Sequence, residues 1–330
     1  MLKRKLATLL IVIGIAGVAG LVAWYTLLPR QRPALPVHVD LTQERIERGR
    51  YLVINVLQCV DCHSERDWSL YGGPPQQPIG AGRACLTRDT EVAGVNVGQE
   101  HFPGTLCIRN ITPDDETGIG LWTDGEIIRA VREGVDRHGK GLFPIMPYFV
   151  YAKVADTDME AVVAYLRTMK PVRSARRPAR EVDFPLNLLI QLWPQPLPGP
   201  VLAPDPSDRI AYGRYLATIA RCEFCHTPRP LNSKDGFPGR EFAGGMPFHL
   251  TNERVMYSMN LTPDPSGLGT WTREQFIQRF RDRAVPYPVT LKENTLMNWS
   301  AFAGMTDEDL GALYDFFQTL PPVAYRQEPI

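Results

Sequence analysis

Residues 59–63 read CVDCH, and residues 222–226 read CEFCH. A Cys-x-x-Cys-His run is the attachment signature of covalently bound haem. The two thiols add to the two vinyl groups of the porphyrin, and the adjacent histidine then lies under the ring and ligates the iron. The sequence therefore predicts two covalently bound haem c groups. The predicted attachment residues are Cys59, Cys62, Cys222 and Cys225, and the predicted iron ligands are His63 and His226.

The two motifs belong to a longer repeat, in which six blocks recur in the same order. RIERGRYL at 45–52 matches RIAYGRYL at 209–216, for example, and NITPD at 110–114 matches NLTPD at 260–264. The remaining matches are GIGLWT (118–123) with GLGTWT (267–272), MPYFVYAKVADTD (146–158) with MNWSAFAGMTDED (297–309), and AYLRTMKPV (164–172) with DFFQTLPPV (315–323). We therefore predict two copies of one domain of roughly 120–130 residues.

A Cys-x-x-Cys pair alone has other interpretations. It can be half of a zinc site or a thioredoxin-like redox pair, and two pairs can form one four-cysteine zinc site. Here both pairs are followed by histidine and both occupy the same place in the repeat, which favours haem.

Each copy is predicted to be mostly helical with long loops, because strand signals are weak. One helix carries the Gly-Arg-Tyr-Leu block, and a middle helix follows a Trp-Thr pair with Thr123 or Thr272 as its N-cap. Acidic residues in the first turn mark the start of the last helix, and prolines end it. The expected middle helices are 124–133 and 273–282, and the expected last helices begin at Asp156 and at Thr306 or Asp307.

The N-terminal region contains a run of 23 residues without charge, from residue 6 to residue 28. Such a run is long enough to cross a bilayer as a helix, and Trp24 and Tyr25 lie where aromatic rings favour the interface. A cleaved signal peptide is the alternative, although its apolar core is usually shorter. The basic residues 3–5 indicate that the N-terminus stays inside. We predict a single-pass anchor in the inner membrane of a bacterium, with the haem domains on the periplasmic side.

The predicted organisation has four parts. Residues 1–40 are a cytoplasmic stub, transmembrane anchor and linker, 41–172 form the first domain, and 208–330 form the second. The intervening segment, 173–207, begins with a basic stretch and continues as an apolar, proline-rich one. A free linker would be more polar. We expect this segment to pack over the domains, near the membrane or against a partner subunit.

The second axial ligand decides what a haem does, because methionine gives a six-coordinate electron-transfer centre and an open position allows peroxide chemistry. Met146 and Met297 stand at equivalent repeat positions before the last helix, so we predict that they ligate the irons. The rival ligands are Met256, Met259 and Met305 in the second copy, and the unmatched His138 and His249.

Cys85 and Cys107 have no counterpart in the second copy. An exported compartment is oxidising, so we predict a disulfide that closes the loop between them and braces it over the first haem. Two buried free thiols are the alternative.

The motif order resembles class I cytochromes c, most closely the cytochrome c subunits of membrane-bound alcohol, gluconate and sorbitol dehydrogenases. The resemblance covers about residues 41–172 and 208–324. One feature differs: those subunits usually carry three haem motifs, whereas this chain has two. It implies a fold of two tandem class I domains. It also implies that Asn110, Trp122, Asn260 and Trp271 line the haem pockets, where each indole N–H meets a haem propionate. Alternatively, the tryptophans are core residues at a helix start.

Lysine plus arginine and aspartate plus glutamate are equal at 36 each, so no overall field points to nucleic acid. No Ser-His-Asp set or phosphate loop stands out, and we predict no catalysis by this chain alone. We expect a membrane-anchored dihaem cytochrome that moves electrons from a dehydrogenase or quinol-oxidising complex to a downstream acceptor. The alternatives are a dihaem peroxidase, or the electron-entry subunit of a terminal oxidase or another respiratory or photosynthetic complex.

Overall fold

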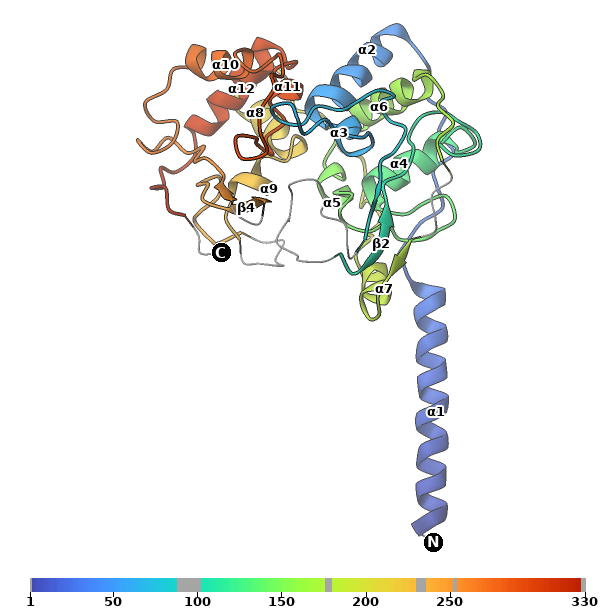
Figure 1. Cartoon of the computed structure of the whole chain (residues 1–330). Helices are drawn as coiled ribbons and strands as arrows, with labels where there is room; N and C mark the ends of the chain where they lie inside the picture. Colours follow the sequence, from blue (N-terminus) through green and yellow to red (C-terminus); the bar gives the residue numbers. More distant parts are fainter. Residues whose placement is uncertain (1, 88–101, 176–179, 230–235, 252–253, 328–330) are drawn as a thin grey trace.

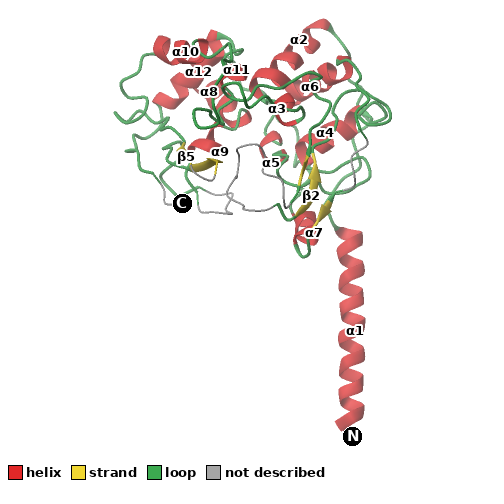
Figure 2. Ribbon diagram, in the orientation of Figure 1, coloured by secondary structure: helices red, strands yellow, loops and turns green. Residues whose placement is uncertain are grey.

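The computed structural model describes residues 2–87, 102–175, 180–229, 236–251 and 254–327. Helices dominate this part of the chain, as the sequence predicts (Figure 2). The long helix α1 (Leu2–Leu27) extends away from a two-lobed head, in which the blue-to-green elements form one lobe and the orange-to-red elements the other (Figure 1). The predicted apolar N-terminal helix is therefore present, and it is long and apolar enough to cross a membrane.

The first lobe is built around two crossing helices. Its helices are α2 (Gln43–Tyr51) with the π-helical η1 (Leu52–Val56), α3 (Cys59–Cys62), α4 (Asp124–Glu133), α5 (Tyr148–Tyr151) and α6 (Asp156–Thr168). α2 packs on α6 at Gly49, where an added Cβ would lie 1.8 Å from the carbonyl oxygen of Ala161. Only glycine permits this approach, which brings the apolar faces of α2, η1 and α6 into one core.

The second lobe repeats this arrangement. Its helices are α8 (Arg209–Ile219), α9 (Cys222–His226), α10 (Arg273–Arg281), α11 (Trp299–Phe302) and α12 (Asp307–Gln318). α8 packs on α12 at Gly213, where an added Cβ would lie 1.9 Å from the carbonyl oxygen of Ala312. The matched Gly-Arg-Tyr-Leu blocks thus form matched helix crossings.

Both middle helices begin where the sequence predicts. The side chain of Thr123 accepts from the backbone N–H of Glu126, whose carboxylate accepts from the Thr123 N–H. Thr272 and Gln275 form the same reciprocal pair before α10. These capping boxes satisfy N–H groups that a helix start leaves without intrahelical partners.

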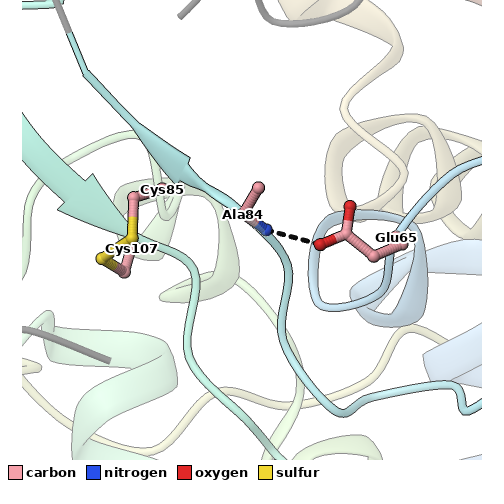
Figure 3. Close-up of a disulfide and its surroundings, with 4 residues drawn as sticks. All are labelled: Glu65, Ala84, Cys85 and Cys107. Carbon is pink, nitrogen blue, oxygen red and sulfur yellow. Dashed lines mark hydrogen bonds between the residues drawn. A yellow bond between two sulfur atoms is a disulfide. The ribbon is translucent and has the colours of Figure 1, made fainter. Parts of the chain in front are cut away.

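Short antiparallel strands complete the described head. β1 (Cys85–Leu86), β2 (Gly104–Cys107) and β3 (Glu181–Val182) form one sheet in that order, and β4 (Pro247–Thr251) pairs with β5 (Arg254–Tyr257). Cys85 lies opposite Cys107, and a disulfide joins them (Figure 3). The adjacent backbone N–H of Ala84 donates to the carboxylate of Glu65, at 2.6 Å, which ties this strand pair to the loop after the first Cys-x-x-Cys-His motif (Figure 3). The predicted brace concerns residues 88–101, which lie outside the described residues.

Candidate functional site

Each Cys-x-x-Cys-His motif forms a short helix that follows a residue with left-handed backbone. That residue is Gln58 before α3, with φ of 56°, and Arg221 before α9, with φ of 63°. The four motif cysteines carry free thiols, and burial raises the pKa of Cys59 and Cys222 to about 12. Burial therefore disfavours the thiolate form of these two cysteines.

The two motif histidines make equivalent hydrogen bonds. Nδ1 of His63 pairs with the carbonyl oxygen of Arg109 at 2.7 Å, and Nδ1 of His226 pairs with that of Met259 at 2.7 Å. The carbonyl can only accept, so Nδ1 carries the proton and Nε2 keeps its lone pair for a metal. Desolvation lowers the pKa of both histidines, which favours the neutral form that ligates metals.

The carbonyls that fix the histidines belong to loops held by Asn110 and Asn260. The side-chain oxygen of Asn110 accepts from the backbone and hydroxyl of Thr112, and its amide donates to Thr117 Oγ1 and to the Val172 carbonyl. Asn260 makes the same four kinds of bond to matched partners, Thr262, Ser266 and Val323. Each asparagine therefore clamps its loop to the chain that leaves the last helix. Their predicted place in the haem pocket stays a prediction.

The two predicted methionine ligands occupy equivalent places. Met146 and Met297 are partly buried against the same apolar core as Cys59 and Cys222. Their role as iron ligands stays a prediction.

The alternative candidates for the iron ligand lie in different surroundings. Met259 is 63% exposed and its carbonyl lies on the Nδ1 side of His226, while Met305 is buried before α12. The sulfur of Met256 accepts from the Thr295 hydroxyl at 3.7 Å. His138 is exposed, and the side chain of His249 lies outside the described part of the chain.

The two tryptophans are partly buried before α4 and α10 and pack against the core. The carbonyl of Trp122 accepts from the Arg167 guanidinium, and that of Trp271 accepts from the Tyr314 hydroxyl at 2.6 Å. The guanidinium carbon of Arg279 lies 5.6 Å from the Trp271 ring centroid. These contacts suit core residues at a helix start, and the propionate contact stays a prediction.

Sequence reasoning missed Tyr148, which follows Met146 by two residues. Its hydroxyl is buried and has no hydrogen-bond partner among the described residues. A buried hydroxyl without an acceptor is costly, so an acceptor oxygen of a bound group, such as a haem propionate, would satisfy it. The signal that could have found Tyr148 is its aromatic match in the repeat, Trp299.

A zinc site does not fit this arrangement. Within the described ranges, no three His, Cys, Asp or Glu side chains are grouped so that they could hold a metal ion. Haem attachment requires a different group of side chains. These are two cysteines outside any disulfide, a neutral histidine with Nε2 available, and apolar surroundings. The residues at both motifs fit haem on each of these points.

Comparison with known proteins gives the family. No family model matches the chain. A dihaem c-type cytochrome of Cereibacter sphaeroides is 30% identical over 275 residues, which cover 82% of this chain and 78% of that protein. The chain belongs to the c-type cytochromes. The cytochrome is thus related to electron-transfer proteins, in agreement with the prediction from its motifs.

The cytochrome is also similar to dehydrogenase subunits, as its sequence predicts. The gluconate 2-dehydrogenase cytochrome c subunit of Pantoea cypripedii is 30% identical over 293 residues, 83% of this chain and 59% of that subunit. The alcohol dehydrogenase (quinone) cytochrome c subunit of Gluconacetobacter polyoxogenes is 28% identical over 313 residues, 89% of this chain and 60% of that subunit. The cytochrome therefore spans about 60% of the length of these relatives.

The lobes of the cytochrome are joined by crossed contacts. The Tyr51 hydroxyl of the first lobe donates to the Asp309 carboxylate of the second at 2.5 Å, and it accepts from the Thr306 N–H. The Tyr215 hydroxyl of the second lobe donates to Asp158 of the first at 2.7 Å, and it accepts from the Ala155 N–H. Each tyrosine of the repeated Gly-Arg-Tyr-Leu block thus binds the start of the other lobe's last helix.

The first Cys-x-x-Cys-His motif also lies at this boundary. The amide of Asn298, next to Met297, donates to Gln58 at 2.7 Å and to Asp61 at 3.2 Å, and its oxygen accepts from Arg66 at 2.5 Å. Arg221 interacts electrostatically with cysteines of both motifs, and its guanidinium carbon lies 6.0 Å from the ring centroid of Tyr151 in the first lobe. The candidate methionine loop of the second lobe therefore contacts the attachment motif of the first.

Proposed function

We propose that this cytochrome is a membrane-anchored electron carrier with two covalently bound haem c groups. Each group belongs to one of two tandem class I cytochrome c domains, 41–172 and 208–330, which are joined by the proline-rich segment 173–207. The observation that carries this proposal is the pair of matched motifs, each with two free thiols and a histidine fixed through Nδ1. The N-terminal part, 1–40, supplies a cytoplasmic stub, the anchor and a linker.

Haem iron, when bound, supplies reversible one-electron chemistry. Cys59 and Cys62 would hold one group and Cys222 and Cys225 the other. His63 and Met146 would hold the iron of the first group, and His226 and Met297 that of the second. The carbonyls of Arg109 and Met259 orient the imidazoles, and the apolar cores exclude water. No side chain of the chain needs to gain or lose a proton in this function.

The position of the two motifs supports a relay within the chain. Because the candidate methionine loop of the second lobe contacts the attachment motif of the first, the two proposed haem sites would be neighbours across the lobe boundary. We propose that the head lies on the periplasmic side of an inner membrane and accepts electrons from a dehydrogenase or quinol-oxidising complex. A downstream redox protein then receives them, and the chain performs no catalysis alone.

Haem content tests the first part of this proposal. The full chain, expressed with a haem-attachment system, is expected to carry two covalent haems per chain in a pyridine haemochrome assay. Changing both motif cysteines of one lobe to serine, in C59S/C62S or C222S/C225S, is expected to leave one. The control C85S/C107S is expected to keep two. One haem in the unchanged chain would contradict the proposal.

Purification from native membranes tests the partner. A dehydrogenase chain that co-purifies with the cytochrome and reduces it with substrate is the expected result. Peroxide turnover by the purified cytochrome would instead indicate a peroxidase, and co-purifying oxidase chains would place it in another complex.

A further inference from the structure

An apolar turn links the two lobes in the sequence. It comprises residues 184–193, including α7 (Leu186–Leu189) and the 3₁₀ helix η2 (Ile190–Leu192). Buried Ile190 fixes the turn to the head, yet four other large apolar side chains are exposed. They are Phe184, which is 78% exposed, and Leu189, Leu192 and Trp193. No Asp, Glu, Lys or Arg occurs between residues 184 and 204, so the turn itself carries no charged side chain.

Contacts place the apolar turn beside the end of α1. The Gly141 N–H donates to Gln191 in the turn at 3.2 Å, and the Arg180 guanidinium donates to the Gly141 carbonyl at 2.7 Å. Two residues earlier, Gly139 lies against Gln31, which follows α1 closely. The turn and the chain that leaves α1 therefore meet on the same loop of the first lobe. α7 lies at the base of that lobe, close to the end of α1 (Figure 1).

The short connection between α1 and the first lobe keeps the apolar turn near the end of α1. α1 ends at Leu27, and Arg32 is already bound to the first lobe through its ion pair with Glu133 at 2.7 Å. The Arg129 guanidinium also donates to the Arg32 carbonyl at 3.2 Å. Five residues reach at most about 18 Å when fully extended. A bilayer that surrounds α1 therefore lies within reach of the apolar turn.

We propose that the apolar turn inserts into the surface of the membrane that α1 crosses, so that the head has two membrane contacts. This inference rests on the proposed anchor role of α1. Phenylalanine, leucine and tryptophan suit the boundary between headgroups and acyl chains, where binding grows with the apolar area buried. The second contact would limit tilting of the head and hold the second lobe away from the lipid.

Lipid quenching in vesicles tests this contact without any protein partner. The full chain, with its haems, is reconstituted in vesicles of neutral and anionic phospholipid. Single cysteines are introduced by Phe184→Cys or Trp193→Cys and labelled with an environment-sensitive fluorophore. Both sites are exposed, so the fold is expected to persist. Brominated phospholipids are expected to quench both labels several-fold more than a label at Val285→Cys. Val285 is a matched control because it is also 78% exposed but lies in the second lobe.

A label introduced in α1 by Val18→Cys separates the two possible failures. If that label is quenched while those at positions 184 and 193 behave like the Val285 control, the anchor stands and the second contact is wrong. If the label in α1 is not quenched, the anchor role fails and the inference fails with it.

Discussion

Asn110 and Asn260 show how one side-chain type organises each site from a distance. The family resemblance implies that they line the haem pockets, yet their amides are engaged by the protein itself. Each amide joins the loop that carries the histidine-binding carbonyl to the chain after the last helix. A buried polar group of this kind stabilises a fold when all its bonds are made, and destabilises it when one is left open.

Asn110→Ala is expected to lower the free energy of unfolding of the first lobe by about 2–4 kcal/mol, because it leaves the Thr112 N–H and the Val172 carbonyl without these partners. Thermal unfolding followed by circular dichroism measures the change. Exposed Asn187 offers a control, since Asn187→Ala is expected to have little effect. Equal melting temperatures for the two variants would show that the clamp is unimportant.

At the residue scale, the sequence indicated the candidate haem residues but not the side chains that hold them in place. Both motifs, both histidines and the Cys85–Cys107 pair could be recognised from spacing and compartment alone. The roles of Asn110 and Tyr148 could not, because they depend on partners far along the chain. Val172, for example, lies 62 residues after Asn110. No local pattern shows which distant carbonyl an amide will reach.

At the scale of elements, cap residues and charge patterns located the middle and last helices well. The short strands were not predicted, since a strand of two residues such as β1 exists only through its partner. The closeness of the main helix crossings was also missed. Gly49 and Gly213 match each other in the repeat, but the sequence does not show why glycine is needed there. The reason is the close packing of α2 on α6 and of α8 on α12.

Gly49→Ala is expected to destabilise the first lobe by about 1–3 kcal/mol, because the new methyl group would overlap the Ala161 carbonyl unless the helices separate. Gly213→Ala is expected to do the same in the second lobe. Gly199→Ala serves as the control, since an added Cβ there meets nothing within 4 Å. Thermal unfolding of the three variants provides the comparison, and a melting temperature for Gly49→Ala as high as that of the control would contradict this account of the crossing.

At the scale of the whole molecule, the lobe boundary links one candidate haem site to the other. Asn298 stands beside Met297 yet bonds to Gln58, Asp61 and Arg66 of the first lobe. This contact depends on how the two lobes dock. The repeat in the sequence predicted two domains, but it contained no information on how they dock.

Asn298→Ala is expected to loosen the Met297 loop and to lower the reduction potential of the second haem by an amount on the order of tens of millivolts, because a thioether ligand favours ferrous iron. Redox titration followed by absorbance measures both potentials. Asn55→Ala is the control, since Asn55 also crosses the boundary, by donating to the Gly304 carbonyl at 2.9 Å, without touching either motif. Unchanged reduction potentials in Asn298→Ala would show that the contacts of Asn298 with the first lobe do not affect the second haem.

The crossed tyrosine contacts have the form of an isologous interface, in which the same patch on two subunits pairs with itself about a twofold axis. Two identical subunits would have to place identical residues at both ends of that axis. Fusion into one chain removes this restriction, and the matched positions have diverged: Gln58 stands opposite Arg221 in the repeat, and buried Asp61 opposite Phe224. With the proposed haems bound, these different residues beside the two motifs would give the two irons different reduction potentials. Such a difference in potential is open to the fused pair, whereas a dimer with exact twofold symmetry would have two identical sites.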